Sequence, residues 1–306
     1  MFSLAHLSDV HLGPLPEAAA WRNFKLKRIV GSLSWWFIRR KLHDPSVAAL
    51  IAADIRQAAP NHIALTGDIV NLSAYAEFPR AAQWVRALAG PSQLTFVPGN
   101  HDCYVECPWA NGLGHLAPWM TGDMRTGDTQ SNSAIATPFP FVRLRKNIAL
   151  IALSSARPQA LHRAAGRLGL QQLQSLPPLL RDLRERGYAR IVLIHHPPLP
   201  GLAVARKALD DAAQLRAILE QEGAELVLHG HNHRTMLHPL KTKFGTCNVL
   251  GVPSASLGSA EGHTPAAWNL YRIVRQDGRW LTDVTIRGYD PTSRTIKTAS
   301  EFSLSS

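Results

Sequence analysis

The side chains in this sequence that could bind metal ions or transfer protons gather in five short motifs, each directly after an apolar run. The motifs read SDVH, TGDI, GNHD, IHHP and GHNH. Their candidate residues are Asp9, His11, Asp68, Asn100, His101, Asp102, His195, His196, His231 and His233. Carboxylate, amide and imidazole ligands together suit Mn²⁺, Fe or Zn²⁺, whereas shells of oxygen alone suit Mg²⁺ and Ca²⁺. The set exceeds the need of one ion, so we expect two ions that share a bridging carboxylate.

The GNHD motif shows why such positions indicate a site. Residues 94–97 are expected to form a short strand that a Pro-Gly pair ends, so Asn100, His101 and Asp102 lie on the following loop. In α/β sheets the C-terminal edge of the strands is where ligands bind. For this motif alone the alternative is an ordinary turn, in which Asn100 and Asp102 accept hydrogen bonds from backbone amides. The four further motifs favour a site.

The elements that must position these motifs alternate between strands and helices. One helix is expected to begin at the N-cap Asp44, with proline at its first helical position, and to end at Pro60. Its expected apolar face comprises Val47, Leu50, Ile51 and Ile55. Further helices are expected at 78–88, at 169–187 with an interruption at Pro177-Pro178, and at 211–222. The alternation favours an α/β fold with all five motif loops at one edge.

The C-terminal part has a different pattern. Two strand-like runs at 266–275 and 279–289 are joined by Gln276-Asp277-Gly278, the composition of a tight hairpin turn. An antiparallel addition to the sheet is therefore expected. The tail after Arg294 is expected to be frayed.

The five motifs, in this order, resemble those of the calcineurin-like metallophosphoesterases. Asp-x-His, Gly-Asp, Gly-Asn-His-Asp, His-x-Pro and Gly-His-x-His are complete and span residues 9–233. The resemblance implies an α/β/β/α sandwich of two mixed sheets flanked by helices. It also implies one phosphoesterase domain at 1–290, with an insert at about 14–43 and a tail at 291–306. The implied cofactors are two divalent metal ions, namely Mn²⁺, Fe²⁺/³⁺ or Zn²⁺.

The resemblance also implies roles for individual residues. One ion would be held by Asp9, His11 and His233, and the other by Asn100, His195 and His231, with Asp68 bridging the two. His101 would lie near the leaving oxygen, and Asp102 would orient His101. Two cations about 3.5–4 Å apart can activate water and neutralise charge on phosphoryl oxygens. A histidine that donates a proton to the departing oxygen contributes roughly 10²–10⁴ in rate.

Two further histidines lie in or beside these motifs, and neither is the favoured metal ligand. The family's ligand in the fourth motif lies two residues before proline, which selects His195 over the less favoured alternative His196. His229, on the strand before Gly230, is expected to pack in the core.

The composition indicates which classes of protein fit this chain. The chain has 306 residues, of which 45% are hydrophobic and 18% charged, and no uncharged apolar run approaches the roughly 18 residues of a membrane span. We expect a cytoplasmic protein without a cleaved signal. Its three cysteines show neither zinc-finger nor Cys-x-x-Cys spacing, so reduced bystander thiols are expected.

The net charge of +11 is concentrated in one segment. Residues 21–42 carry seven positive charges and no acidic residue, together with five Trp or Phe side chains. A basic, Trp-bearing amphipathic helix can lie on an anionic membrane surface, here on its inner face. The alternative is packing against the protein's own core, and nucleic acid is less favoured because aromatic density favours lipid.

The expected substrate is a phosphodiester or a pyrophosphate. Membrane-associated relatives include UDP-2,3-diacylglucosamine hydrolases, and soluble relatives cleave cyclic nucleotides or glycerophosphodiesters. A non-catalytic interaction module with this fold is the rival class, but the chain retains every ligand and the acid. The sequence decides neither among the substrates nor the oligomeric state.

Overall fold

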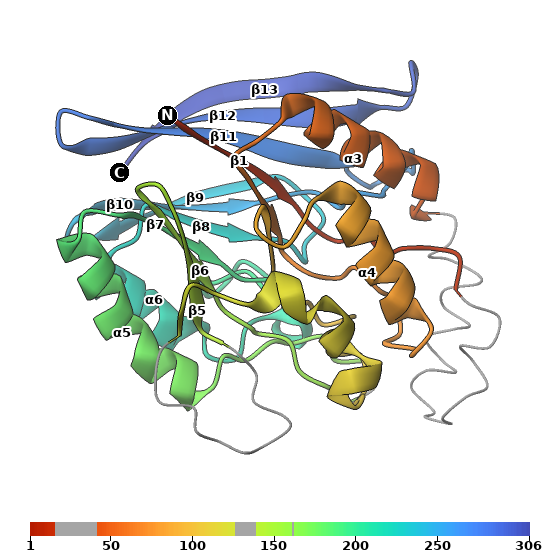
Figure 1. The fold of residues 1–306 in the computed structure, drawn as a ribbon, viewed down its shortest axis with the longest axis horizontal. Helices are drawn as coiled ribbons and strands as arrows, with labels where there is room; N and C mark the ends of the chain where they lie inside the picture. Colours follow the sequence, from red (N-terminus) through yellow and green to blue (C-terminus); the bar gives the residue numbers. More distant parts are fainter. Residues whose placement is uncertain (16–41, 126–138, 161) are drawn as a thin grey trace.

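A computed structural model describes residues 1–15, 42–125, 139–160 and 162–306, which form two mixed β-sheets flanked by helices (Figure 1). The predicted α/β/β/α sandwich is confirmed. Nearly all of the basic segment at 21–42, and of the insert predicted at 14–43, lies outside the described residues. Among the helices described, none is long and apolar enough to cross a membrane.

The first sheet has six strands in the order β13-β12-β11-β1-β2-β3. Its parallel part comprises β1 (Phe2–Leu7), β2 (His62–Leu65) and β3 (Leu94–Phe96). Its antiparallel part comprises β11 (Ala267–Gln276), β12 (Arg279–Asp290) and β13 (Thr295–Ser305). The predicted hairpin is confirmed, because Asp277 and Gly278 join β11 to β12 with φ angles of 50° and 79°, as a tight turn requires.

The second sheet has seven strands in the order β4-β5-β6-β7-β8-β10-β9. They are β4 (Met124–Arg125), β5 (Phe141–Arg145), β6 (Ile148–Ala152), β7 (Ala189–Leu193), β8 (Leu226–His229), β9 (Met236–Thr242) and β10 (Gly245–Gly251). Strands β6, β7, β8 and β10 run parallel. The central strands are buried on both faces, which explains why they read as continuous apolar runs.

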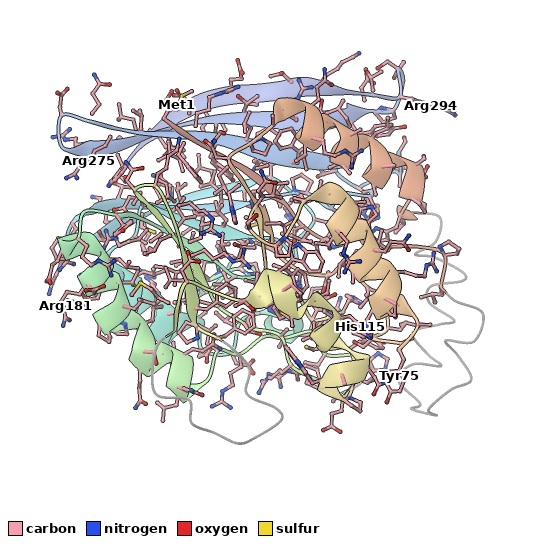
Figure 2. All side chains as sticks on the ribbon, in the orientation of Figure 1. Met1, Tyr75, His115, Arg181, Arg275 and Arg294 are labelled. Atoms are coloured by element: carbon pink, nitrogen blue, oxygen red, sulfur yellow. The ribbon has the colours of Figure 1, made fainter. Side chains whose placement is uncertain are left out.

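Alternate side chains of strand β6 belong to two different hydrophobic cores. Ile148 and Leu150 belong to the core that joins the two sheets, whereas Ala149 and Ile151 belong to the core under the helices of the second sheet. This alternation follows from the two-residue period of a strand. Figure 2 shows the side chains that fill the space between the layers.

Within the described parts of the chain, four longer helices cover the outer faces of the sheets. They are α3 (Pro45–Ala58), α4 (Glu77–Leu88), α5 (Leu170–Glu185) and α6 (Ala212–Glu222). Three short 3₁₀ helices, η3 (Trp109–Asn111), η4 (Leu113–Met120) and η5 (Ala205–Lys207), lie in the connections. Helix α3 begins as predicted, because the Asp44 carboxylate accepts a 2.8 Å hydrogen bond from the amide of Ser46. Its predicted face is confirmed except for Leu50, which is 37% exposed.

The predicted interruption of α5 is wrong. The helix runs from Leu170 to Glu185 through Pro177 and Pro178. Two prolines remove two backbone donors, but their fixed φ is compatible with a helix. The buried face of α5, which includes Leu176, Leu179, Leu180 and Leu183, packs on the second core and holds the helix in place.

The predicted frayed tail is also wrong. Residues after Arg294 form β13, which pairs with β12 along its length and is the edge strand of the first sheet. The long hairpin partner supplies the backbone hydrogen bonds, and Ile296, Phe302 and Leu304 pack against the first core.

Candidate metal centre and active site

The five motifs come together because each follows a parallel strand. Three motif loops leave the C-terminal ends of β1, β2 and β3 in the first sheet. The other two leave the C-terminal ends of β7 and β8 in the second sheet. Since the two sheets pack face to face, their loops meet at one edge of the sandwich, as the sequence predicts for such an edge.

One group of candidate ligands consists of Asp9, His11 and His233, whose ligand atoms all lie within 4.8 Å of one another. Asp9 Oδ1 is 3.1 Å from His233 Nε2 and 3.9 Å from His11 Nε2. His11 Nε2 is also 3.9 Å from Asp68 Oδ2. The carboxylate of Asp68 therefore borders this group.

A second group surrounds His195 Nε2. This nitrogen is 3.1 Å from Asn100 Oδ1, 3.2 Å from His231 Nδ1 and 3.4 Å from Asp68 Oδ2. Asp9, Asp68 and His195 again offer ligand atoms within 4.8 Å of one another. The two groups are therefore contiguous, with Asp68 Oδ2 facing both.

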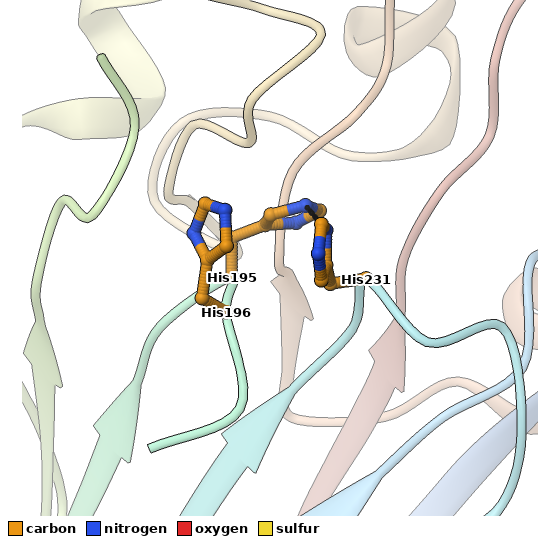
Figure 3. Close-up of side chains that lie close together, drawn as sticks. All are labelled: His195, His196 and His231. Carbon is orange, nitrogen blue, oxygen red and sulfur yellow. Dashed lines mark hydrogen bonds between the residues drawn. The ribbon is translucent and has the colours of Figure 1, made fainter. Parts of the chain in front are cut away.

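His195, His196 and His231 lie close together (Figure 3) and offer ligand atoms within 4.8 Å of one another. The hydrogen bonds of His195 and His196 distinguish the two residues. Both nitrogens of His196 have protein partners, because Nδ1 is 2.7 Å from Ser155 Oγ and Nε2 is 3.1 Å from the Ala164 carbonyl. His195 Nδ1 lies 2.6 Å from the Thr66 carbonyl, which leaves Nε2 among the other ligand atoms. A carbonyl behind a metal-ligating histidine is the usual arrangement. His229 is fully buried and bonds the Gly230 carbonyl at 3.0 Å, as expected of a core histidine.

The motif backbones are held in strained conformations. Among the described residues, the candidate ligands with positive φ are Asp9, His11, Asp68, His231 and His233, at 55°, 45°, 54°, 69° and 53°. Such conformations cost energy for residues other than glycine and persist only where neighbours fix them. Here the amides of Asp9 and His11 donate 2.9 Å hydrogen bonds to the carbonyls of Gly67 and Asp68. The loops that follow β1 and β2 thus stabilise each other through backbone hydrogen bonds.

The glycines of two motifs allow this close approach. A Cβ on Gly99 would lie 2.2 Å from Asp68 Oδ1, and one on Gly230 would lie 1.9 Å from Ser8 Oγ. Neither position can accept a larger residue without moving a ligand-bearing loop. The glycines therefore set the distance between the loops.

His101 is fixed by contacts on several sides. Its Nδ1 lies 2.6 Å from the Asn71 carbonyl, and its ring stacks on Tyr104 with the centroids 5.4 Å apart and the planes at 8°. The ring also meets His11 edge-on at 5.0 Å. The imidazole is thereby placed beside the first ligand group.

The orienting contact predicted for Asp102 is corrected by these distances. The Asn71 carbonyl, not a carboxylate, lies at Nδ1 of His101. Asp102 instead accepts hydrogen bonds from four backbone amides, at 2.7–3.1 Å, from Asp68, Ile69, Val70 and Gly99. The sequence could not show this, because capping and orienting carboxylates look alike in a motif. Asp102 shapes the loop that carries Asp68, as in the turn alternative.

Burial and neighbouring charges shift the pKa values of several residues in the site. Burial raises the pKa of Asp68, but the His195 and His101 imidazoles outweigh it and hold that pKa well below its usual value. Burial lowers the pKa of His195, but the Asp68 carboxylate outweighs burial and raises it to about 9. Burial together with His196 and His195 holds the pKa of His231 well below its usual value. Without a cation, the Asp68 charge is thus balanced by a proton on His195.

The donor set fits divalent metal ions. Ligands bound at about 2.1 Å lie roughly 3.0–3.4 Å from one another around one ion, and the 3.1–3.4 Å contacts of His195 Nε2 match that spacing. Nitrogen and oxygen donors without thiolate suit Mn²⁺, Fe or Zn²⁺. The three cysteines form no disulfide with one another and belong to neither ligand group.

Several supporting residues have no recognisable signal in the sequence. The buried Glu77 carboxylate accepts hydrogen bonds from the amides of Asn71, Leu72 and Ala74 and so holds the carbonyl that contacts His101. Ser254, far along the chain, donates a 2.6 Å hydrogen bond to the Asp9 carbonyl. Neither Glu77 nor Ser254 belongs to a motif that can be recognised in the sequence.

Comparison with known proteins gives one family and one recurring fold. The profile of the calcineurin-like phosphoesterase family matches residues 2–235. A probable cyclic nucleotide phosphodiesterase of Synechococcus sp. is 24% identical over 285 residues, which cover 92% of this chain and 91% of the relative.

Two solved structures illustrate the likeness of fold. A dimetal phosphatase from Danio rerio superposes with a TM-score of 0.62 at 13% identity, covering 99% of this chain and 98% of that one. The purple acid phosphatase PPD1 from yellow lupin gives a TM-score of 0.59 at 10% identity, covering 99% of this chain and 53% of that one. At these identities the likeness concerns the fold alone.

Proposed function

Because the chain belongs to the calcineurin-like phosphoesterase family, we propose that it cleaves a phosphodiester or pyrophosphate bond with two divalent cations. The observation that carries this proposal is the pair of contiguous ligand groups around Asp68. Asp68 Oδ2 lies 3.9 Å from His11 Nε2 on one side and 3.4 Å from His195 Nε2 on the other. One carboxylate oxygen is thus shared between two sets of ligands.

In the proposed centre each group holds one ion. The first ion takes Asp9, His11 and His233, the second takes Asn100, His195 and His231, and Asp68 is shared. Mn²⁺, Fe or Zn²⁺ bound there would supply an activated water and neutralise charge on the phosphoryl oxygens. The protein contributes the fixed ligand positions, which the strained loop conformations and their backbone hydrogen bonds maintain.

His101 is proposed to donate a proton to the departing oxygen. A carbonyl can only accept a hydrogen bond, so the 2.6 Å contact with the Asn71 carbonyl places a proton on Nδ1. Nε2 then carries a proton only when the ring is doubly protonated. In that state the ring can donate from Nε2 and return to the neutral tautomer that the Asn71 carbonyl fixes. Asp102 supports this step indirectly, through the loop backbone.

A phosphodiester is the substrate class favoured by the comparisons. The Synechococcus sp. relative, a probable cyclic nucleotide phosphodiesterase, aligns over nearly the whole of both chains. We therefore propose a cyclic nucleotide, or a similar small phosphodiester such as a glycerophosphodiester, as the first substrate to test.

A second candidate is a lipid-linked pyrophosphate at an anionic membrane surface, as in the UDP-2,3-diacylglucosamine hydrolases. The observation that favours it lies in the sequence: seven basic residues without an acid at 21–42, with Trp21, Phe24, Trp35, Trp36 and Phe37 among them. In the sequence this segment lies between His11 and His43. On this proposal the protein is peripheral on the inner face of the membrane.

A substrate panel tests the function. Purified protein, stripped of metal and reloaded with Mn²⁺, would be assayed on a generic aryl phosphodiester, cyclic nucleotides, glycerophosphodiesters and UDP-linked lipids. We expect turnover that depends on added metal, with the natural class marked by the largest kcat/KM. Complete inactivity of protein that binds two ions would instead favour the non-catalytic interaction module.

A further inference from the structure

His43 lies beside the candidate metal centre, although no motif contains it. Its ring centroid is 4.4 Å from that of His11 and 5.8 Å from that of His233. The residue is only 4% exposed. A third imidazole is therefore buried against two of the three ligands proposed for the first ion.

The backbone around His43 is fixed by the loop that follows β10. The Gly258 amide donates to the Leu42 carbonyl at 3.0 Å, and the Asp44 amide donates to the Ser256 carbonyl at 2.8 Å. These bonds form an antiparallel bridge between His43 and Leu257. Helix α3 begins two residues later, so His43 is held between a bridge and a capped helix.

The side chain of His43 continues this connection toward Asp9. Its Nδ1 lies 2.8 Å from Ser256 Oγ, which lies 3.3 Å from Ser254 Oγ. Ser254 Oγ donates a 2.6 Å hydrogen bond to the Asp9 carbonyl. The chain of contacts therefore joins His43 to the backbone of one ligand while its ring contacts two others.

We propose that His43 is a positioning residue for the first metal ion of the proposed dinuclear centre, acting through Asp9, His11 and His233. This inference rests on the proposed function. His43 belongs to none of the ligand groups found among the described residues, so it orients ligands and does not bind the ion. Its ring restricts the orientations open to the His11 and His233 rings, and its contact with Ser256 links that packing to Asp9.

The expected size of the effect follows from other metal sites. Residues that orient metal ligands typically contribute 10–100-fold to metal affinity. Because the contacts of His43 are with ligands of the first group, removing its ring should weaken one of two binding steps. The step assigned to Asn100, His195 and His231 should keep its affinity.

Stepwise titration of the metal-free protein with Mn²⁺, followed by calorimetry and by electron paramagnetic resonance, tests the proposal. For His43→Ala we expect one step weakened 10–100-fold and a reduced spin-coupled signal at metal concentrations that saturate the wild type. His43→Asn keeps a polar group near Ser256 Oγ and should recover part of the lost affinity. If His43→Ala does not fold, Ser256→Ala decides, with a loss at the same step.

His62 provides a matched control. It is a fully buried histidine whose Nε2 contacts Thr95 Oγ1 at 2.8 Å, at the start of β2 and thus at the far end of that strand from Asp68. His62→Ala should alter stability while leaving both binding steps unchanged.

The outcomes separate this inference from the proposed function. Two unchanged steps in His43→Ala, or an equal weakening of both steps in His43→Ala and His62→Ala, would overturn the positioning role. Wild-type protein that binds fewer than two ions would overturn the dinuclear centre itself.

Discussion

The backbone amide of His101 donates a 2.7 Å hydrogen bond to Oδ1 of Asp68, so the proposed acid and the proposed bridging carboxylate are joined directly. This contact engages one carboxylate oxygen and turns the other, Oδ2, toward His11 and His195. Metal binding and proton donation are therefore positioned by one pair of residues.

His101→Asn should lower kcat by about 10²–10⁴ while metal content stays near that of the wild type, because the imidazole contacts no ion in the proposed centre. Activity assays combined with elemental analysis measure both quantities. His115→Asn, at an exposed histidine of η4, is the control. Loss of metal together with activity in His101→Asn would show that the wrong histidine was assigned as the acid.

Asp102→Asn should destabilise the protein. The carboxylate accepts four backbone amides, two at each oxygen, and an amide nitrogen can accept none. A buried donor left without its acceptor costs about 1–3 kcal/mol, and the amide nitrogen leaves two amides without one, so the free energy of unfolding should fall by at least about 2 kcal/mol. Urea denaturation measures this fall. A variant as stable as the wild type would contradict the role of Asp102 as the acceptor that holds the Asp68 loop.

Metal binding should release a proton from His195. Its pKa is raised to about 9 in the metal-free protein, so at pH 7 the ring is protonated and a cation must displace that proton. Affinity for the second ion should therefore fall as pH is lowered below about 9, by up to about tenfold per pH unit. Calorimetry in two buffers of different ionisation enthalpy counts the released protons. A Kd independent of pH between 6.5 and 8.5 would count against this coupling.

The basic segment at 21–42 should bind anionic vesicles through two contributions. The electrostatic part, about 1 kcal/mol per basic residue near the surface, should weaken with salt, whereas the apolar part should persist. Vesicle sedimentation should show binding that high salt reduces and that a Gly-Ser replacement of the segment abolishes. A wild-type protein that ignores anionic vesicles at low salt would leave a soluble phosphodiester as the better substrate.

The sequence predicts most of the fold, because its local patterns agree with the final packing. The Asp44 cap, helix α4 and the Asp277-Gly278 turn are local features, and each is found as predicted. The continuity of α5 depends instead on packing with distant segments, and the pairing of β13 depends on a long hairpin with β12. The core of the second sheet holds α5 across Pro177 and Pro178, and β12 supplies the hydrogen bonds of β13.

The candidate site likewise has one part that the sequence predicts and another that it does not. Motif residues such as Asp9 and His231 converge because parallel strands end at a common edge of the sheets. The sequence predicts this edge, since each motif follows an apolar run. The contacts of Asn71 with His101 and of His43 with His11 are different, because they join segments with no shared pattern. A carbonyl or a ring in such a place becomes visible only when the chain is folded.

The most direct test of the dinuclear centre is the metal content of Asp68→Asn. Wild-type protein reloaded with Mn²⁺ should contain close to two ions per chain, as measured by elemental analysis after removal of free metal. Asp68→Asn should contain fewer and lose turnover of the aryl phosphodiester, while Asp182→Asn, at an exposed carboxylate of α5, should match the wild type. An Asp68→Asn protein with two ions and full activity would contradict the bridging role on which the account rests.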